Sequence, residues 1–300
     1  MADELEILSR ILPGLSSKPE VILPPGDDCA AVAIGGRLIL AAVDQVIGDI
    51  HYFRQSTPAE KIGAKVLKRN LSDIAACGGT PTFALLSLAL GQEVTDDWID
   101  RFYTGLETCC RKYHVALIGG DLGILPANCE TEVASLTILG EVPEQCLARR
   151  DAAQPGDLIC VTGQLGNSLD SEHHLDFEPR LEEGLFLTSH GVKAMIDISD
   201  GLLLDLKRMA IASQLSCQLS IDTLPLRSGA TREGALTDGE DYELLFSISP
   251  DCYKLLRREW YFHTELTCIG RMVAGDSGTI TDLSGKLLTL GKTGYVHQRV

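Results

Sequence analysis

The stretch NLSDIAACGG at residues 70–79 ends an amphipathic helix and carries one acidic side chain, Asp73. Upstream, Thr57 is a candidate helix cap, Pro58 suits the first helical position, and Glu60 completes a capping-box pattern. Downstream, the pair Gly78-Gly79 and then Pro81 prevent the helix from continuing. The sequence therefore predicts one helix from about residue 58 to residue 77.

Apolar residues recur along this helix at a spacing that places them on one buried stripe: Ile62, Val66, Leu67, Leu71, Ile74 and Ala75. Asn70 and Asp73 are three residues apart and share another face. Taken alone, Asp73 is typical of a solvated surface charge. The rest of the chain favours a functional role for Asp73 instead, because aspartate recurs beside glycine at other predicted segment ends.

The chain length and composition indicate an α/β (α+β) protein of two domains. Three hundred residues exceed the size of most single cores, and a hydrophobic fraction of 45% is too high for a disordered chain. Helical periodicity fades between residues 141 and 154, near the positively charged pair Arg149-Arg150. We expect one domain over residues 1–140 and a second, C-terminal α/β domain over residues 141–300.

The net charge of −16 argues against a nucleic-acid or anionic-membrane partner and suits divalent cations. No run of eighteen apolar residues occurs, and the acidic start Met1-Ala2-Asp3-Glu4 is unlike a signal peptide, so we expect a cytoplasmic enzyme. The ten cysteines are scattered, with no C-x-x-C pair, and we interpret them as reduced small hydrophobic residues.

Acidic residues stand at the ends of several predicted strands and helices, nearly always beside glycine. They are Asp27 and Asp28, Asp44, Asp73, Asp121, Asp197 and Asp200, and Glu240 and Asp241. Such a set, with little His or Cys, selects hard cations, and Mg²⁺ takes a few carboxylates while leaving room for phosphate. The pattern predicts phosphoryl transfer from a nucleotide, in line and without a covalent intermediate, since no nucleophile elbow is present.

Two further motifs leave alternatives open. The glycines of Gly163-Gln164-Leu165-Gly166-Asn167-Ser168 can turn backbone N–H groups toward a phosphate, although the stretch matches neither the Walker nor the dinucleotide pattern. His173-His174, among acids in residues 169–180, can bind a metal, but a solvated loop is the safer interpretation.

The order of these motifs resembles that of the thiamine-monophosphate kinase family, within the superfamily of aminoimidazole ribonucleotide synthetase. The resemblance rests on GDDCA (26–30), Asp44 with GDIHY (48–52), NLSDIAACG (70–78), GGD (119–121), PGD with VTGQLGNS (155–168), DISDGL (197–202) and GEDYELL (239–245). It covers nearly the whole chain. It implies two domains, each a mixed β-sheet packed with helices, and a homodimer formed through the first sheet.

The resemblance also implies the activity, which is ATP-dependent phosphorylation of thiamine monophosphate with several Mg²⁺ ions. By position, the magnesium ligands are Asp27, Asp28, Asp44, Asp73, Asp121 and Asp197, with Asp200 on an additional ion. The nucleotide contacts are Gly120, Asp121, Arg150 and Ser199. The substrate contacts are His51 and Glu240.

Several residues depart from the family pattern. Ala42 and Val43 stand where Thr or Ser is usual, Leu122 replaces a threonine, Asn167 an aspartate and Asp238 a glycine, and Lys292 lies where an aromatic would stack on the thiamine ring. Two alternatives follow: an enzyme on the same scaffold with another small substrate, or a nucleotide-binding relative without turnover. The absence of a C-terminal cysteine argues against the hydrogenase-maturation branch, and the absence of a reactive residue in a glycine-rich tail argues against the selenophosphate branch.

Overall fold

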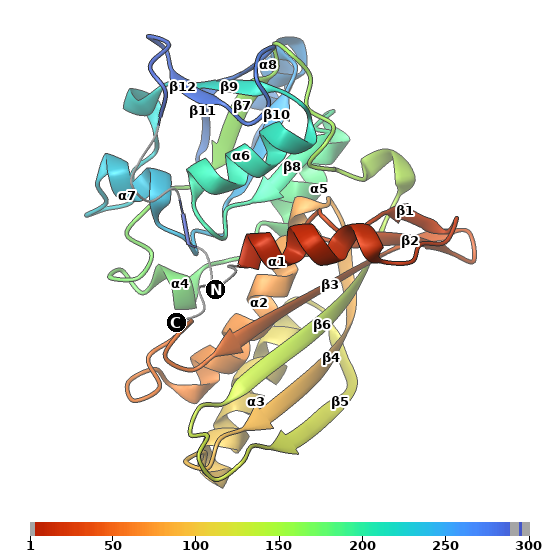
Figure 1. Cartoon of the computed structure of the whole chain (residues 1–300), viewed down its shortest axis with the longest axis vertical. Helices are drawn as coiled ribbons and strands as arrows, with labels where there is room; N and C mark the ends of the chain where they lie inside the picture. The colour runs from red at the N-terminus through yellow and green to blue at the C-terminus, as the bar shows by residue number, and fades with distance from the viewer. Residues whose placement is uncertain (1–3, 289–293, 296–300) are drawn as a thin grey trace.

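The computed structural model describes residues 4–288 and 294–295, which form two six-stranded sheets with helices between and around them (Figure 1). The first sheet has the order β1-β2-β3-β6-β4-β5 and the second has the order β12-β9-β11-β7-β10-β8. The strands of the first sheet are β1 (Val21–Leu23), β2 (Ala30–Ile34), β3 (Arg37–Ile47), β4 (Thr80–Leu90), β5 (Ala116–Ile124) and β6 (Val133–Val142). Those of the second are β7 (Leu158–Thr162), β8 (Ala194–Asp197), β9 (Ser216–Leu219), β10 (Leu244–Ile248), β11 (Leu266–Val273) and β12 (Ile280–Asp282).

Eight α-helices and three short 3₁₀ turns connect these strands within the described residues. The helices are α1 (Glu4–Ile11), α2 (Ala59–Ala76), α3 (Asp96–Lys112), α4 (His173–Asp176), α5 (Leu181–Ser189), α6 (Leu202–Ala212), α7 (Arg232–Thr237) and α8 (Pro250–Glu259), and the turns are Leu12–Gly14, Glu144–Cys146 and Ile221–Thr223. No described helix is both long enough and apolar enough to cross a bilayer.

Helices α2 and α3 pack on one face of the first sheet and leave the other face open (Figure 1). Burial therefore alternates along its strands, as it does in β6, where every second side chain is buried. The predicted buried strand over residues 82–90 is half exposed for this reason, with Phe83 and Leu85 on the open face. The second sheet has core on both faces, and β10 is buried throughout.

Helix α2 lies between the two sheets and contributes to both cores. Its stripe, including Ile62 and Leu71, packs into the first sheet, whereas Ala75 and Ala76 join the cluster beneath α5 and β8. The helix begins at Ala59, and no side-chain cap is formed at its start, so the predicted Thr57 capping box is wrong. The predicted end is confirmed, because Gly78 adopts a left-handed φ of +68°.

Two predicted strand ends are wrong. Strand β3 continues past Asp44 to Ile47, because β6 pairs with it residue by residue from Leu38 to Ile47. Strand β5 likewise continues through Gly119-Gly120-Asp121 to Ile124, where β4 supplies a parallel partner. Cross-strand pairing therefore extends both strands beyond the acid that suggested an end.

The segment 169–180 is not a solvated loop. His174 is 3% exposed and its Nδ1 bonds with the Ser168 carbonyl, while the His173 ring bonds with the Asp241 carbonyl. Phe177 is buried and stacks on Tyr242 at 3.9 Å between ring centroids. Through these contacts, residues 169–180 cover the region between α2 and the second sheet.

Candidate active site

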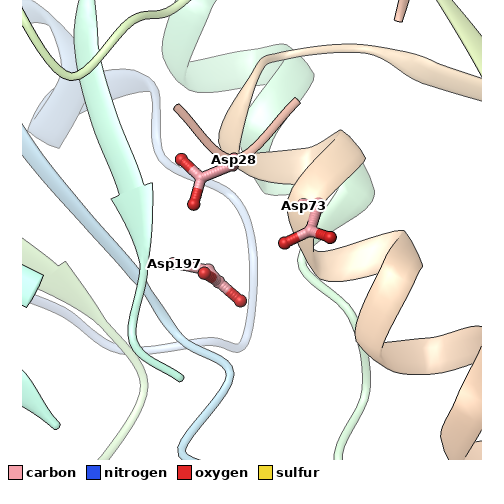
Figure 2. A group of neighbouring side chains, drawn as sticks. All are labelled: Asp28, Asp73 and Asp197. Atoms are coloured by element: carbon pink, nitrogen blue, oxygen red, sulfur yellow. The ribbon is translucent and has the colours of Figure 1, made fainter. Parts of the chain in front are cut away.

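Three aspartates from distant parts of the chain meet where the two sheets approach α2. One carboxylate oxygen from each of Asp28, Asp73 and Asp197 lies within 4.8 Å of the others, and the side chains point toward one another (Figure 2). Asp28 comes from the bend between β1 and β2, Asp73 from the last turn of α2, and Asp197 from the final position of β8. This oxygen-only set has the chemistry that a hard divalent cation requires.

The electrostatics of the cluster also favour a cation. Burial, and then the charges of Asp44, Asp197 and Asp28, raise the pKa of Asp73 well above its ordinary value. Burial and the charge of Asp28 likewise raise the pKa of Asp197, although the Ser72 hydroxyl donates to it at 2.6 Å. Carboxylates held this close resist ionising together, and a bound cation removes that cost.

Asp27 and Arg150 flank the cluster. Arg150 forms an ion pair with Asp28, with 2.6 Å between Nη2 and Oδ1, and its backbone N–H donates to Asp27. Burial and the neighbouring Asp28 raise the pKa of Asp27 to about 7. The guanidinium predicted to contact nucleotide thus lies against the acids predicted to bind metal.

Asp44 lies on the buried face of β3, toward α2, and its charge acts on both Asp73 and Asp197. It pairs with Arg69, at 3.0 Å between Nε and Oδ2. The Asp44 backbone N–H donates to the Asn70 side chain, which is buried. Arg69 was not foreseen from the sequence, although it lies four residues before Asp73 on the same helix.

A cavity of about 410 Å³ lies beside the cluster. Its lining includes Ser199, which follows Asp197 by two residues in the sequence. It is lined by Ile50, His51, Arg69, Asn167, Leu169, Asp170, Ser199, Asp200, Thr237, Asp238, Gly239, Glu240, Tyr242 and Tyr295. Four of the predicted site residues, namely His51, Ser199, Asp200 and Glu240, are therefore brought to one cavity. Lys292 lies outside the described residues, and the aromatic rings in the lining belong to Tyr242 and Tyr295.

Buried Lys65 connects His51 to Glu240. Its side chain is fully buried, and Nζ donates to the His51 carbonyl at 2.6 Å and to Glu240 Oε2 at 2.9 Å. Burial lowers the Lys65 pKa to about 8, against the opposing charge of Glu240. Glu240 has a left-handed φ of 62°, and its N–H donates to the Ser199 carbonyl, so this loop is fixed against residues 197–201.

Asp200 faces the cavity but is paired with Arg208, at 2.6 Å between Oδ2 and Nη1. Arg208 also contacts Asp205, which lies in the first turn of α6 and accepts the N–H groups of Asp200 and Gly201. Burial and Asp200 raise the pKa of Asp205 to about 7. Arg208 and Asp205 were likewise not foreseen.

The glycine stretch at residues 163–168 does not present its N–H groups to the cavity as expected. The Gly166 N–H donates to Asp241 and the Asn167 N–H donates to Asp238 Oδ2. Asp241 is fully buried and also accepts from Ser168 and Arg227. The N–H groups of Gly166 and Asn167, which the sequence left open for a phosphate, therefore donate to carboxylates of the chain itself.

Gly120 and Asp121 lie away from the cluster in this chain. Asp44 pairs with Leu136, Leu136 with Leu86, and Leu86 with Gly120, so three ladder steps of about 4.8 Å separate Asp44 from Gly120. A Cβ at Gly120 would lie 1.7 Å from the Leu86 carbonyl oxygen, so close strand packing accounts for this glycine.

Magnesium should stabilise the protein more at about pH 8 than at about pH 6.5, because protons and cations compete for the same carboxylates. Acids whose pKa is raised in the folded protein hold protons that the unfolded chain has lost, and binding of a cation must displace them. One displaced proton over this range is worth about 2 kcal/mol. We expect the rise in Tm on replacing EDTA by Mg²⁺ to be larger at the higher pH by about 3 °C or more, measured by scanning calorimetry. Equal shifts at both pH values would contradict this.

The chain is similar to known proteins over nearly its whole length. The family described as AIR synthase related protein matches with its N-terminal domain at residues 26–142 and with its C-terminal domain at residues 146–282. Thiamine-monophosphate kinase of Rhodopirellula baltica is 34% identical, over 93% of this chain and 92% of the relative. Thiamine-monophosphate kinase of Bacillus subtilis is 31% identical, over 98% of this chain and 99% of the relative. A solved structure of AaThiL complexed with AMPPCP and TMP is 28% identical, with a TM-score of 0.80 over 99% of this chain and 97% of that one. The chain belongs to the AIR synthase related proteins and, within them, to the thiamine-monophosphate kinase family.

Proposed function

We propose that this protein transfers the γ-phosphoryl group of ATP to the phosphate of thiamine monophosphate, giving thiamine diphosphate and ADP. The observation that carries the proposal is the carboxylate cluster of Asp28, Asp73 and Asp197 beside a cavity of about 410 Å³. The relatives named thiamine-monophosphate kinase span the whole chain, which supports the same reaction. The predicted cytoplasmic location stays a prediction.

The cavity lining suits thiamine monophosphate. Its thiazolium ring is a cation, and Asp170, Asp200, Asp238 and Glu240 line the cavity with carboxylates. Tyr295 supplies an aromatic ring for stacking, and its backbone N–H donates to the Asp200 carbonyl. The proposed substrate contacts His51 and Glu240 lie on this wall, held together by Lys65.

We propose that Asp28, Asp73 and Asp197 hold Mg²⁺, with Asp27 and Asp44 beside them and Asp200 on a separate ion. When bound, Mg²⁺ neutralises charge on the transferring phosphoryl group. The chain's own residues position the reactants, because Lys65 fixes the loops of His51 and Glu240. Ser199 and Arg150 stay proposed nucleotide contacts.

A coupled assay for ADP, with separation of thiamine diphosphate by chromatography, tests the function. We expect product only when ATP, thiamine monophosphate and Mg²⁺ are all present. ATP binding without thiamine diphosphate formation would favour the alternatives of another small substrate or of a relative without turnover.

We also propose a homodimer formed through the open face of the first sheet. That face carries large exposed apolar side chains, namely Val43, Phe83, Leu85 and Ile118. Two strand edges are unpaired among the described strands: β2 accompanies β3 only as far as Ala41, and β5 has β4 on one side alone. In a two-fold symmetric dimer that joins these edges, the partner's β5 lies beside residues 42–47. The partner's Gly120 and the partner's Asp121 then lie toward the carboxylate cluster.

Mixing two inactive variants tests this arrangement. We expect Asp73→Asn and Asp121→Asn each to be inactive as homodimers. After unfolding and refolding together, about a quarter of wild-type activity should return, because half of the dimers are mixed and each mixed dimer has one intact site. Light scattering gives the oligomeric state. A monomeric wild type, or no recovery on mixing, would contradict the proposal.

A further inference from the structure

Three charged side chains occupy successive turns of α2 on the face toward the cavity. Lys65, Arg69 and Asp73 are spaced four residues apart, and each is engaged by a different part of the site. Lys65 binds the loops of His51 and Glu240, and Asp73 belongs to the carboxylate cluster. Arg69 lies between them, and neither the sequence motifs nor the carboxylate cluster assigns it a function.

Strand β3 holds the Arg69 guanidinium at two of its three nitrogens. Its Nε donates to Asp44 Oδ2 and its Nη1 donates to the Gln45 carbonyl, both at 3.0 Å. Nη2 forms no hydrogen bond with the described residues, and the side chain is 13% exposed in the lining of the cavity. The planar group is therefore held in one orientation with donors left for a ligand.

Arg69 differs in charge from the other charged residues that line the cavity. Among the described residues that line the cavity, four are acidic and Arg69 is the one arginine or lysine. The acids suit a thiazolium cation but repel a phosphate. Neither Ala42 nor Val43 offers a side-chain oxygen beside Asp44, and Arg69 neutralises that carboxylate. The phosphate end of a substrate is thus favoured at the Arg69 end of the cavity, next to Asp44.

We propose that Arg69 is a specificity-determining residue whose Nη2 edge binds the phosphate of thiamine monophosphate, so that the cavity selects the phosphorylated substrate over thiamine. The inference rests on the proposed function and adds to it a role for the Arg69 guanidinium in recognising the substrate. A guanidinium held at Nε and Nη1 presents the N–H donors of Nη2 to phosphate oxygens in a fixed direction, which a flexible lysine does not.

Isothermal titration with thiamine monophosphate and with thiamine, in Mg²⁺ and without nucleotide, tests this role. For Arg69→Met we expect the Kd of thiamine monophosphate to rise about tenfold or more and that of thiamine to change less than about twofold. Arg69→Lys should show a smaller loss, again confined to thiamine monophosphate. Lys61→Met removes a charge from the same helix outside the cavity lining and should leave both values unchanged.

The outcomes separate two kinds of failure. A wild type that binds neither ligand overturns the proposed function and, with it, this inference. A wild type that prefers thiamine monophosphate, together with an Arg69→Met variant that keeps the preference or weakens both ligands equally, overturns the role of Arg69 alone. If Arg69→Met does not fold, Arg69→Lys decides, and an equal loss for both ligands contradicts the proposal.

Discussion

We expect the replacement of Asp73 by asparagine to reduce kcat by about a thousandfold or more, and the cation-free variant to unfold at a higher temperature than the wild type. The loss of rate is expected because the amide removes one of the three charges proposed to hold a cation, which is worth several kcal/mol in the transition state. The gain in stability follows because burial and the charges of Asp44, Asp197 and Asp28 disfavour an ionised Asp73 when no cation is bound. The two effects have opposite signs, which a simple packing defect does not produce.

Steady-state kinetics with ATP and thiamine monophosphate gives the rate, and calorimetry in EDTA and in Mg²⁺ gives the stability. Asp100→Asn is the matched control, since Asp100 is exposed on α3 and the same chemical change there should alter neither quantity. Stabilisation by Mg²⁺ should also be much reduced in Asp73→Asn. Full activity of that variant at low Mg²⁺ would show that Asp73 is not a ligand.

The sequence was sufficient to predict the elements that depend on local signals. The sequence predicts a helix cap at Thr95 and a strand over residues 158–162. In the structure Thr95 accepts the Trp98 N–H at the start of α3, and β7 spans Leu158–Thr162. Helix α2 ends at its glycines as predicted. The predictions that went wrong, such as strand ends at Asp44 and Asp121, depended on cross-strand pairing with β6 and β4, which is set by residues far away in sequence.

The candidate site likewise contains residues that local motifs predict and residues that depend on pairing between distant segments. The motifs that place Asp28, Asp73 and Asp197 are local, and the structure brings these three residues together. The cations that pair with Asp44 and Asp200 were missed because an ion pair such as Arg69 with Asp44 joins a helix to a strand without any contiguous pattern. The spacing of Lys65, Arg69 and Asp73 was a usable signal, since charges four apart beside a buried stripe share one helix face.

The loop at residues 163–168 depends on a buried ion pair, so we expect Arg227→Met to reduce the free energy of unfolding by about 3–5 kcal/mol at about pH 8. Arg227 donates to Asp241 Oδ1 at 2.6 Å and to the carbonyl groups of Gln164 and Gly166. Asp241 is fully buried, so the variant leaves a carboxylate without its cation. Urea denaturation, followed by a spectroscopic probe of the second sheet, measures the loss.

The pH dependence of that loss identifies its cause. Burial, opposed by Arg227, already raises the pKa of Asp241 to about 6, and removing the cation raises it further. The penalty exists only while Asp241 is ionised in the variant, so the loss is largest above the variant's raised pKa. It shrinks as the pH falls from there toward the wild-type value of about 6, below which both folded proteins hold the proton. Arg232→Met, which breaks an exposed pair with Asp222, should cost less than about 1 kcal/mol at any pH. Equal losses in the two variants, or a loss for Arg227→Met that does not shrink in acid, would mean that packing of the arginine stem, rather than the charge on Asp241, holds the loop beside the cavity.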